Sequence, residues 1–346
     1  MKKYNSIHDL VSDFDKIENH SLIFGFDEIG NNDLVLNFDK TGNNDTLIKF
    51  NKELIPLLDL LEKVNPCNQN YEVNHDCILV TYILKLNLFN FLGGFSFKTN
   101  AQIIGLPISI SEKGYWGEAA SIEAIIKQRK GLKILLNGNS GFKNAGKTLS
   151  TFVFENRYIC FKDYLNSLRS SYRRRLKKAL SKRELIKINK FDRKDFNENH
   201  YKLYMSIMNR TENPLEILPI EFFTNYEAEL YEFISKDTNE IIGFIQLKEM
   251  NDRLCFLFGG FRQEDNERYD LYYNMLLKIV ETGIDKKIGV IEFGQTAEES
   301  KLKIGCVEVP RFLYVHHSNP VLNWVIQALL PLFSYKPYQI KHHVFK

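Results

Sequence analysis

A formal phosphate-binding motif stands at residues 141–148, GFKNAGKT, which fits the pattern G-x-x-x-x-G-K-T. In a working phosphate loop the last residue opens a helix, so that backbone N–H groups and the helix dipole face the phosphates. The residues after Thr148, LSTFVFENRYICF, are rich in aromatic and β-branched side chains and predict a strand instead. No clear apolar strand ending in a magnesium-binding aspartate follows at a suitable distance. We therefore predict a lysine-bearing turn between domains that binds no nucleotide.

The second candidate is a basic segment at residues 161–183, FKDYLNSLRSSYRRRLKKALSKR. Apolar side chains recur every three or four residues after Asp163, which predicts an amphipathic helix capped by that aspartate. Residues 169–183 hold eight Lys or Arg and no acid, and the basic face includes Arg173, Arg174 and Lys177. A solvated face is one interpretation of this charge. Binding to the phosphates of a coenzyme, an RNA or a lipid is the other.

A carboxylate and a glycine turn end the strand predicted over residues 286–295, KKIGVIEFGQ. Sheets of α/β proteins bind ligands beyond the carboxyl ends of their strands, so Glu292 is placed to accept a proton there. Gly294 and Gln295 follow in the turn, where backbone and side-chain amides can donate to a carbonyl oxygen. The alternatives are a surface carboxylate at the end of a strand and an ordinary turn.

Hydroxyl, imidazole and thiol groups elsewhere form weaker patterns. Tyr314 and Tyr269 can serve as protonating hydroxyls, but they are two of 17 tyrosines. His75 and Cys77 supply two metal ligands without a third nearby, so we predict no metal site. The sequence also shows no convincing Ser-His-Asp or Cys-His pattern for a covalent nucleophile.

The elements that must position these groups alternate between strands and helices. In both halves the pattern predicts two strands, a helix and a further strand, at residues 77–97, 101–109, 121–130 and 131–141, and again at 241–250, 253–261, 267–283 and 286–295. The segments LGGFSF and GLKILLNGNSG match FGGFRQ and IGVIEFGQT in one plan of strand, loop, helix, parallel strand and turn. We predict a mixed α/β fold of two similar halves that meet near residues 150–160.

Composition limits the class of protein. The 346 residues suffice for two domains, and 44% hydrophobic with 26% charged residues excludes a wholly disordered chain. A net charge of +3 argues against a general polyanion binder, so any nucleic-acid contact must rest on a local patch. Five cysteines without a CxxC pair, and a beginning without an apolar signal segment, favour the reducing cytoplasm.

Residues 161–315 resemble the Fem-like branch of the GNAT acyltransferase superfamily, which includes domains labelled as peptidoglycan-biosynthesis-like. Four pieces carry the resemblance in the family's order: the basic helix from residue 161, the segment 204–223 that ends in Phe-Phe, the strand, donor loop and helix at 254–283, and the segment 291–317. The last piece resembles the family's G-x-x-x-x-x-K-x-x-x-G segment, with one residue more between Gly294 and Lys301. The resemblance implies two tandem GNAT-like domains, at residues 1–155 and 156–346. It implies that the C-terminal domain builds most of the ligand cleft.

The resemblance implies transfer of an acyl group from an acyl-CoA-type donor to an amine of a small-molecule, sugar or cell-wall-precursor acceptor. An aminoacyl-tRNA donor is the alternative, and residues 169–183 would then contact RNA. The ordinary GNAT pyrophosphate loop is absent, since RQEDNERYDLY holds no glycine and four acids. That departure puts coenzyme A binding by such a loop in doubt. A non-catalytic binding protein on the same fold is a third hypothesis, and no tightly bound cofactor is implied.

Direct acyl transfer needs a neutral amine, a carbonyl held at attack distance and donors for the oxyanion. We expect Glu292 to take the amine proton while Gln295 and the turn amides stabilise the oxyanion. Lys301 matches a position in the family's final helix and is expected to contact phosphate or carboxylate. His316 lies near a histidine of some family members, and it follows Tyr314 as the next candidate for proton transfer.

The last apolar segment, PVLNWVIQALLPLFSY at residues 320–335, contains Pro331 and is shorter than the roughly 20 residues that span a membrane. It either covers a domain face or lies on a membrane surface, with the basic residues up to His343 near lipid phosphates. A lipid-linked acceptor would suit the second arrangement. We expect a cytoplasmic protein, which in that case is peripheral to the inner face of the membrane.

Overall fold

The computed structural model describes residues 1–13, 33–38, 46–65, 67–87, 98–143, 145–210 and 216–346. Contacts divide the chain into unit 1, residues 1–149 and 310–336, and unit 2, residues 150–309 and 337–346. The chain enters unit 2 along β9 (Ala145–Glu155) and leaves it along β15 (Val307–His317). Residues 310–336 therefore group with the N-terminal part, although the sequence placed them in the C-terminal domain. The division into tandem domains at residue 155 stays a prediction.

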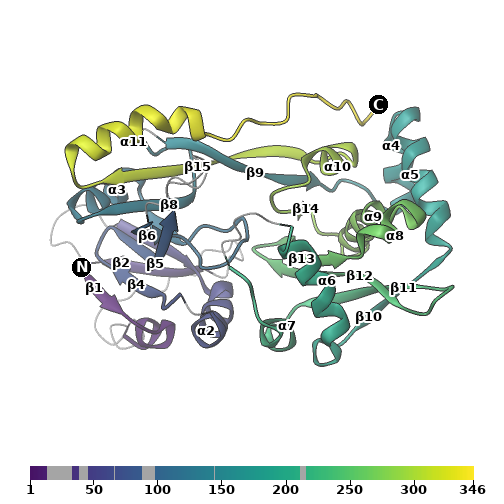
Figure 1. Cartoon of the computed structure of the whole chain (residues 1–346), viewed down its shortest axis with the longest axis horizontal. Coiled ribbons are helices and arrows are strands. Elements are labelled where there is room, and N and C mark those ends of the chain that lie inside the picture. The colour runs from purple at the N-terminus through teal and green to yellow at the C-terminus, as the bar shows by residue number, and fades with distance from the viewer. Residues whose placement is uncertain (14–32, 39–45, 66, 88–97, 144, 211–215) are drawn as a thin grey trace. The chain divides into compact units, whose positions relative to one another are not determined.

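Unit 1 contains a mixed sheet in the strand order β1-β4-β5-β6-β8-β15, with β7 paired to β5 (Figure 1). The pair β6–β8 is parallel, and the other pairs of that path for which a register is given are antiparallel. The bounds are β1 Lys2–Tyr4, β4 Asn70–Val73, β5 Cys77–Asn87, β6 Lys98–Ile104, β7 Tyr115–Gly117 and β8 Leu132–Gly138. A separate two-stranded sheet pairs β2 (Asp33–Phe38) with β3 (Thr46–Asn51).

The helices of unit 1 are residues 7–13, η1 (Lys52–Leu54), α2 (Ile55–Val64), α3 (Ala119–Gln128) and α11 (Pro320–Phe333). Ile122 and Ile126 of α3 pack with Leu79 and Leu135 in one apolar cluster. Tyr82, Ile103 and Val315 form a second cluster, against which Ile326 and Leu330 of α11 pack. Both clusters draw on strands of the same sheet, because successive side chains of a strand point to opposite faces.

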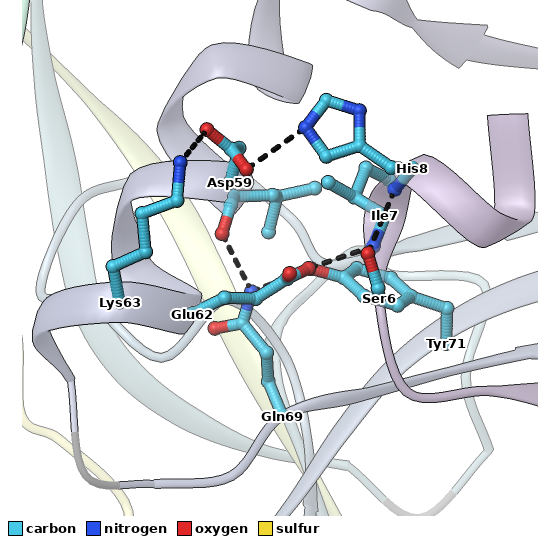
Figure 2. A network of polar contacts seen from close by, with 9 residues as sticks. Ser6, Ile7, His8, Asp59, Glu62, Lys63, Gln69 and Tyr71 are labelled. Atoms are coloured by element: carbon cyan, nitrogen blue, oxygen red, sulfur yellow. Dashed lines mark hydrogen bonds and ion pairs between the residues drawn. The ribbon is translucent and has the colours of Figure 1, made fainter.

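A polar network holds the first helical residues of the chain to α2 (Figure 2). The Glu62 carboxylate accepts hydrogen bonds from the Ile7 N–H at 2.7 Å and from the Tyr71 hydroxyl at 2.6 Å. The Asp59 carboxylate pairs with the His8 imidazole at 2.9 Å. Since these groups satisfy one another, we interpret the network as a structural attachment of the N-terminal segment.

Unit 2 contains a mixed sheet in the order β9-β14-β13-β12-β11-β10. Its only parallel pair among the described strands is β13–β14, and β9 lies antiparallel to β14 on the other side. The bounds are β10 Ile186–Phe191, β11 Glu229–Ser235, β12 Ile241–Met250, β13 Arg253–Phe261 and β14 Val290–Glu292. The prediction of paired strands at residues 241–250 and 253–261 is confirmed residue for residue. The mixed α/β class is confirmed in both units.

The helices of unit 2 are α4 (Phe161–Ser167), α5 (Ser170–Arg183), η3 (Arg193–Asp195), α6 (Glu198–Met208), α7 (Ile220–Asn225), α8 (Gln263–Tyr269), α9 (Leu271–Asp285) and α10 (Glu298–Lys303). Helix α9 is the most deeply buried of these, and Met275, Leu276 and Ile279 are nearly or fully inaccessible to solvent. They pack in one core with β12, β13 and the apolar face of α5.

Two helices predicted as continuous are each broken by tertiary contacts. The predicted helix 161–183 divides at Leu168 and Arg169, whose backbones are extended. Leu168 there forms a β-bridge with Phe345 from the last residues of the chain. The predicted helix 267–283 divides at Asp270, which adopts a left-handed backbone with φ of 44°, and the second part ends at Asp285 rather than Gly283. Asp163 lies in the first turn of α4, but Cys160 is the N-cap residue.

Each unit contains one pair of parallel strands joined through a helix, β6–α3–β8 in unit 1 and β13–α9–β14 in unit 2. The strand, helix and parallel strand that the sequence predicted in both halves are therefore present in both units. Residues 92–97, which the sequence placed first in the N-terminal copy, lie outside the described residues. Among the helices that are described, none is long and apolar enough to cross a membrane.

The segment GFKNAGKT does not open a helix. Strand β9 begins at Ala145, so Gly146, Lys147 and Thr148 all lie within a strand. This confirms the predicted strand after the motif. The motif therefore lacks the helix N-terminus whose backbone N–H groups face the phosphates in a working phosphate loop.

Candidate functional site

The predicted proton acceptor, Glu292, is the last residue of β14 and is 4% exposed. Strand β14 is central, because Glu292 stands opposite Cys255 of β13 on one side and Val153 of β9 on the other. The interpretation of Glu292 as a surface carboxylate is therefore wrong. A buried carboxylate requires a polar or charged partner within the protein.

That partner is Arg253, the first residue of β13. Its guanidinium Nη1 lies 2.9 Å from Oε2 of Glu292, across 39 residues of sequence. The ion pair compensates the burial of the carboxylate. Sequence reasoning missed Arg253 because only the parallel register of β13 and β14 brings the two residues together.

The turn after β14 has a constrained backbone. Gly294, Thr296 and Ala297 have positive φ angles of 68°, 62° and 49°. The Phe152 N–H donates to the Gly294 carbonyl at 3.0 Å, so the chain stays beside β9 for two residues beyond Glu292. Gly294 is partly exposed and Thr296 and Ala297 are exposed. The turn therefore reaches the surface two residues after a buried carboxylate.

Lys301 of α10 lies behind this turn and is 2% exposed. Its Nζ donates a hydrogen bond to the Gln295 carbonyl and lies 5.7 Å from the centre of the Phe152 ring. Burial lowers the pKa of Lys301 to about 7, although acidic groups including Glu292 oppose the shift. A large fraction of this amine is therefore neutral at neutral pH. In the structure Lys301 holds the turn through this hydrogen bond, and its expected contact with phosphate or carboxylate stays a prediction.

A second irregularity lies in β13, next to the end of its ladder with β14. The β13–β14 register ends at Cys255, and the register with β12 shifts where Gln246 faces Phe258 and Leu247 faces Phe256. This bulge is of the kind that often stands beside functional sites. Gln246 is fully buried, and its amide forms no hydrogen bond with any part of the chain that the structure describes. In the sequence, only the presence of an amide side chain within a largely apolar strand marks Gln246.

The segment that replaces the GNAT pyrophosphate loop forms helix α8. The left-handed Asp270 follows it and precedes α9. The side chain of Asn266 accepts a hydrogen bond from the Tyr272 N–H at 2.9 Å, which caps the start of α9. The Asp270 carboxylate pairs with Arg175 at 3.3 Å and with Lys182 at 3.1 Å. The chain's own groups therefore occupy the polar positions at the start of α9.

Apart from Lys178, the basic residues of α5 fall into two sets. Arg175, Lys182 and Arg183 pair with carboxylates of α9 and its N-cap, as with Glu281 at 2.7 Å from Arg183. The predicted phosphate-binding residues form the other set: Arg174 and Lys177 are exposed and Arg173 is partly exposed. Arg173, Arg174 and Lys177 form no ion pair with any carboxylate in the described part of the chain. This set remains available to an anionic partner.

Two predicted site residues lie in unit 1, on β15. Tyr314 is buried beside Phe142, with ring centres 5.8 Å apart, and burial raises the pKa of its hydroxyl to about 12. His316 faces Lys133 in the register with β8, and burial lowers the pKa of its imidazole. Glu292, Gly294, Gln295 and Lys301 all belong to unit 2. Proton transfer by Tyr314 or His316 stays a prediction.

The two potential metal ligands that the sequence analysis rejected as a site, His75 and Cys77, lie in different environments. His75 lies 2.9 Å from Asp76, whereas Cys77 is fully buried, and burial raises the pKa of its thiol to about 12. Over the residues that the structure describes, no group of three His, Cys, Asp or Glu side chains could hold a metal ion.

Comparison with solved structures shows what this fold is similar to. The C-terminal domain of a putative lysylphosphatidylglycerol synthetase from Agrobacterium fabrum aligns with a TM-score of 0.51 and 8% identity, over 80% of this chain and 92% of that chain. The structure of L-PGS from Bacillus licheniformis aligns with a TM-score of 0.50 and 10% identity, over 81% of this chain and 95% of that chain.

FemX aligns over 75% of this chain and 90% of its own, with 11% identity and a TM-score of 0.43 that is too low to carry an argument. No protein-family model matches the chain, and no curated protein matches its sequence. At these identities the comparisons concern the fold alone. They support the acyltransferase-type fold that the sequence resemblance implied.

Proposed function

We propose that this protein transfers an acyl or aminoacyl group to an amine, with the reacting carbonyl bound at the turn after β14. One observation carries the proposal: a turn of partly exposed and exposed residues, 294–297, with three positive φ angles, comes two residues after the buried Glu292, which ends a central parallel strand. The fold shared with a domain of a putative lysylphosphatidylglycerol synthetase supports this reaction class.

In the proposed reaction, Glu292 takes a proton from the acceptor ammonium, directly or through a water molecule. The neutral amine then attacks the carbonyl carbon of the donor, and the Gln295 amide and the turn N–H groups stabilise the oxyanion. Collapse of the tetrahedral intermediate breaks the bond to the donor's thiolate or alkoxide, which takes up the proton that the attacking nitrogen loses. Glu292 then returns its own proton to solvent. Lys301 positions the turn through its hydrogen bond to the Gln295 carbonyl.

We propose aminoacyl-tRNA as the donor. Two observations favour it over the acyl-CoA-type donor expected first from the sequence. The segment that replaces the GNAT pyrophosphate loop forms helix α8, and the side chains of Asn266 and Asp270 occupy the polar positions at the start of α9. The exposed cations of α5 suit a longer polyanion. The acceptor is an amine of a small molecule, a sugar, or a cell-wall or lipid-linked precursor.

The donor is tested by filter binding of labelled aminoacyl-tRNA and of labelled acyl-CoA to the full chain. We expect tRNA to bind with a steep salt dependence and acyl-CoA to be retained only weakly. Tight binding of acyl-CoA alone would reverse the choice of donor. Failure of both would favour the non-catalytic alternative.

The base is tested with Glu292→Gln. We expect transfer of the label to an amine acceptor to fall by about 100-fold, with donor affinity unchanged. Glu299→Gln makes the same chemical change at an exposed carboxylate of α10 and should keep wild-type turnover. Near wild-type turnover in Glu292→Gln would remove this residue from the mechanism.

A further inference from the structure

Helix α11 carries an exposed apolar face. Its 14 residues include no charged side chain. The exposed fractions of Trp324, Leu332 and Val321 are 71%, 73% and 69%, and Leu322 and Leu329 are also exposed. Scattered single apolar residues are normal on a protein surface, but a contiguous set on one helix marks an interaction surface.

The polar side chains of α11 are already used on its inner side. The Asn323 side chain accepts a hydrogen bond from the His317 N–H at 3.0 Å, and the Gln327 amide donates to the Val315 carbonyl at 2.7 Å. Ile326 and Leu330 pack on the sheet of unit 1. The exposed residues of the helix therefore offer no side-chain hydrogen-bond donor except the indole of Trp324.

The near absence of side-chain hydrogen-bond donors on the exposed side of α11 favours a lipid surface over a protein partner. Protein interfaces carry about one hydrogen bond per 100–200 Å² and a polar rim. Acyl chains require no hydrogen bonds, and the interface between acyl chains and head groups favours tryptophan. A helix of 14 residues is about 21 Å long and suits a position in the plane of the interface.

The charge around this helix is complementary to anionic lipid. Residues 310–336, the part of unit 1 that contains α11, have no Asp or Glu and carry Arg311 and Lys336 together with His316 and His317. Basic residues beside an anionic bilayer are attracted to its negative surface potential. Lys336 follows α11 closely and is exposed.

We propose that α11 docks on the surface of a bilayer containing anionic lipids, with Val321, Leu322, Trp324, Leu329 and Leu332 inserted at the boundary between head groups and acyl chains. The inference goes beyond the proposed transferase activity and does not depend on it. It also explains why these apolar side chains stand on the outer side of the helix.

The two tryptophans make the first test specific. Trp116 is 5% exposed and Trp324 is 71% exposed, so a change in polarity around tryptophan reports on α11. Vesicles of phosphatidylcholine with roughly a third phosphatidylglycerol should shift the emission of the full chain to shorter wavelength. Trp324→Phe should abolish the shift and keep vesicle binding. Unchanged emission of the wild-type chain at saturating lipid would overturn the proposal.

The second test is co-sedimentation with the same vesicles. The variant Trp324→Gln with Leu332→Gln should lower the partition coefficient at least about tenfold, because it removes the two most exposed side chains of the face. Ile159→Gln with Ile217→Gln removes exposed apolar surface elsewhere and should bind as the wild type does. Circular dichroism melting curves should coincide for all three proteins.

The remaining outcomes separate lipid from other occupants. Equal partitioning of the Trp324/Leu332 variant and the wild type would contradict the proposal that the exposed side of α11 is the docking face. A wild-type dimer in lipid-free buffer that this variant converts to monomers would assign the face to a second copy instead. Binding to phosphatidylcholine alone as tight as to the mixed vesicles would overturn the role of anionic lipid.

Discussion

Two buried charged side chains, Glu292 and Lys301, lie on either side of one turn in unit 2. Glu292 is compensated by Arg253, whereas the Lys301 amine has a backbone carbonyl as its hydrogen-bond acceptor. Burial of a cation without a directly paired carboxylate favours the neutral amine, which explains the direction of its pKa shift. Such shifted groups are concentrated at functional sites, so Lys301 is the residue whose titration we would measure first.

Lys301→Met should change the pH dependence of stability. The folded pKa of about 7 lies below the ordinary value of 10.5, so between these values the unfolded chain binds more protons than the folded chain. The free energy of unfolding of the wild type therefore rises with pH in this range. Relative to Lys301→Met, we expect a gain of about 1.5 kcal/mol from about pH 7 to about pH 8.5.

Urea unfolding of both proteins at the two pH values measures this difference. The buried thiols, whose raised pKa values act in the opposite direction, begin to ionise in the unfolded chain near the upper end of this window. Both proteins share these thiols, so the difference between wild type and Lys301→Met reports mainly on the amine. Parallel stability curves for wild type and Lys301→Met would show that the amine does not change its protonation on folding in this range.

At the scale of an element, α5 serves two purposes on different sides. Its apolar residues Leu176 and Ala179 are buried in the core of unit 2, and Arg175, Lys182 and Arg183 fix it to α9 and its N-cap. Surface ion pairs contribute at most about 1 kcal/mol each. The charge that remains exposed on α5 is therefore the part that a ligand can use.

Replacing Arg173, Arg174 and Lys177 with Gln should weaken binding of tRNA and flatten its salt dependence. Each lost phosphate contact reduces the slope of log affinity against log salt by about 0.7 to 0.9. Folding stability should change little, since these side chains form no ion pair within the described residues. Arg183→Gln is the control, because it breaks the pair with Glu281 and should lower stability without changing the slope. An unchanged slope in the triple variant would favour the alternative interpretation, in which this face is solvated and binds no phosphate.

At the scale of the whole molecule, the end of the chain completes unit 2. Residues 337–346 belong to that unit, where the Arg169 N–H donates to the Val344 carbonyl at 2.9 Å. Gly305 has a φ of +102°, and a Cβ there would lie 2.3 Å from the ring of Phe345. The tail therefore fills a position that the rest of unit 2 leaves for it.

Deleting residues 337–346 should loosen unit 2 selectively. We expect faster amide hydrogen exchange around residues 164–172 and 301–306, because the deletion removes Val344 and Phe345 from their packing. Exchange in β4 and β5 of unit 1 should stay as in the wild type. Removing only Lys346 is the control, and equal acceleration in both units would contradict this division of the chain.

Local sequence patterns determined the features that depend on neighbouring residues. The apolar runs at residues 241–250 and 253–261 predicted β12 and β13 correctly, and the aromatic and β-branched run after Thr148 correctly predicted a strand there, β9. The parallel crossover and the position of Glu292 at a strand end also followed from the chain order. These features depend on backbone preferences and on the period of apolar residues, which short segments carry by themselves.

Tertiary structure alone decided the features that join distant segments. It paired Glu292 with Arg253, buried Lys301 behind the turn, broke the basic helix at Leu168 through Phe345, and grouped residues 310–336 with the N-terminal part. None of these contacts leaves a local pattern, because burial and strand register depend on which segments pack together. The apolar character of residues 320–333 was visible in the sequence, but which side of the helix stays exposed was set by its packing on the sheet of unit 1.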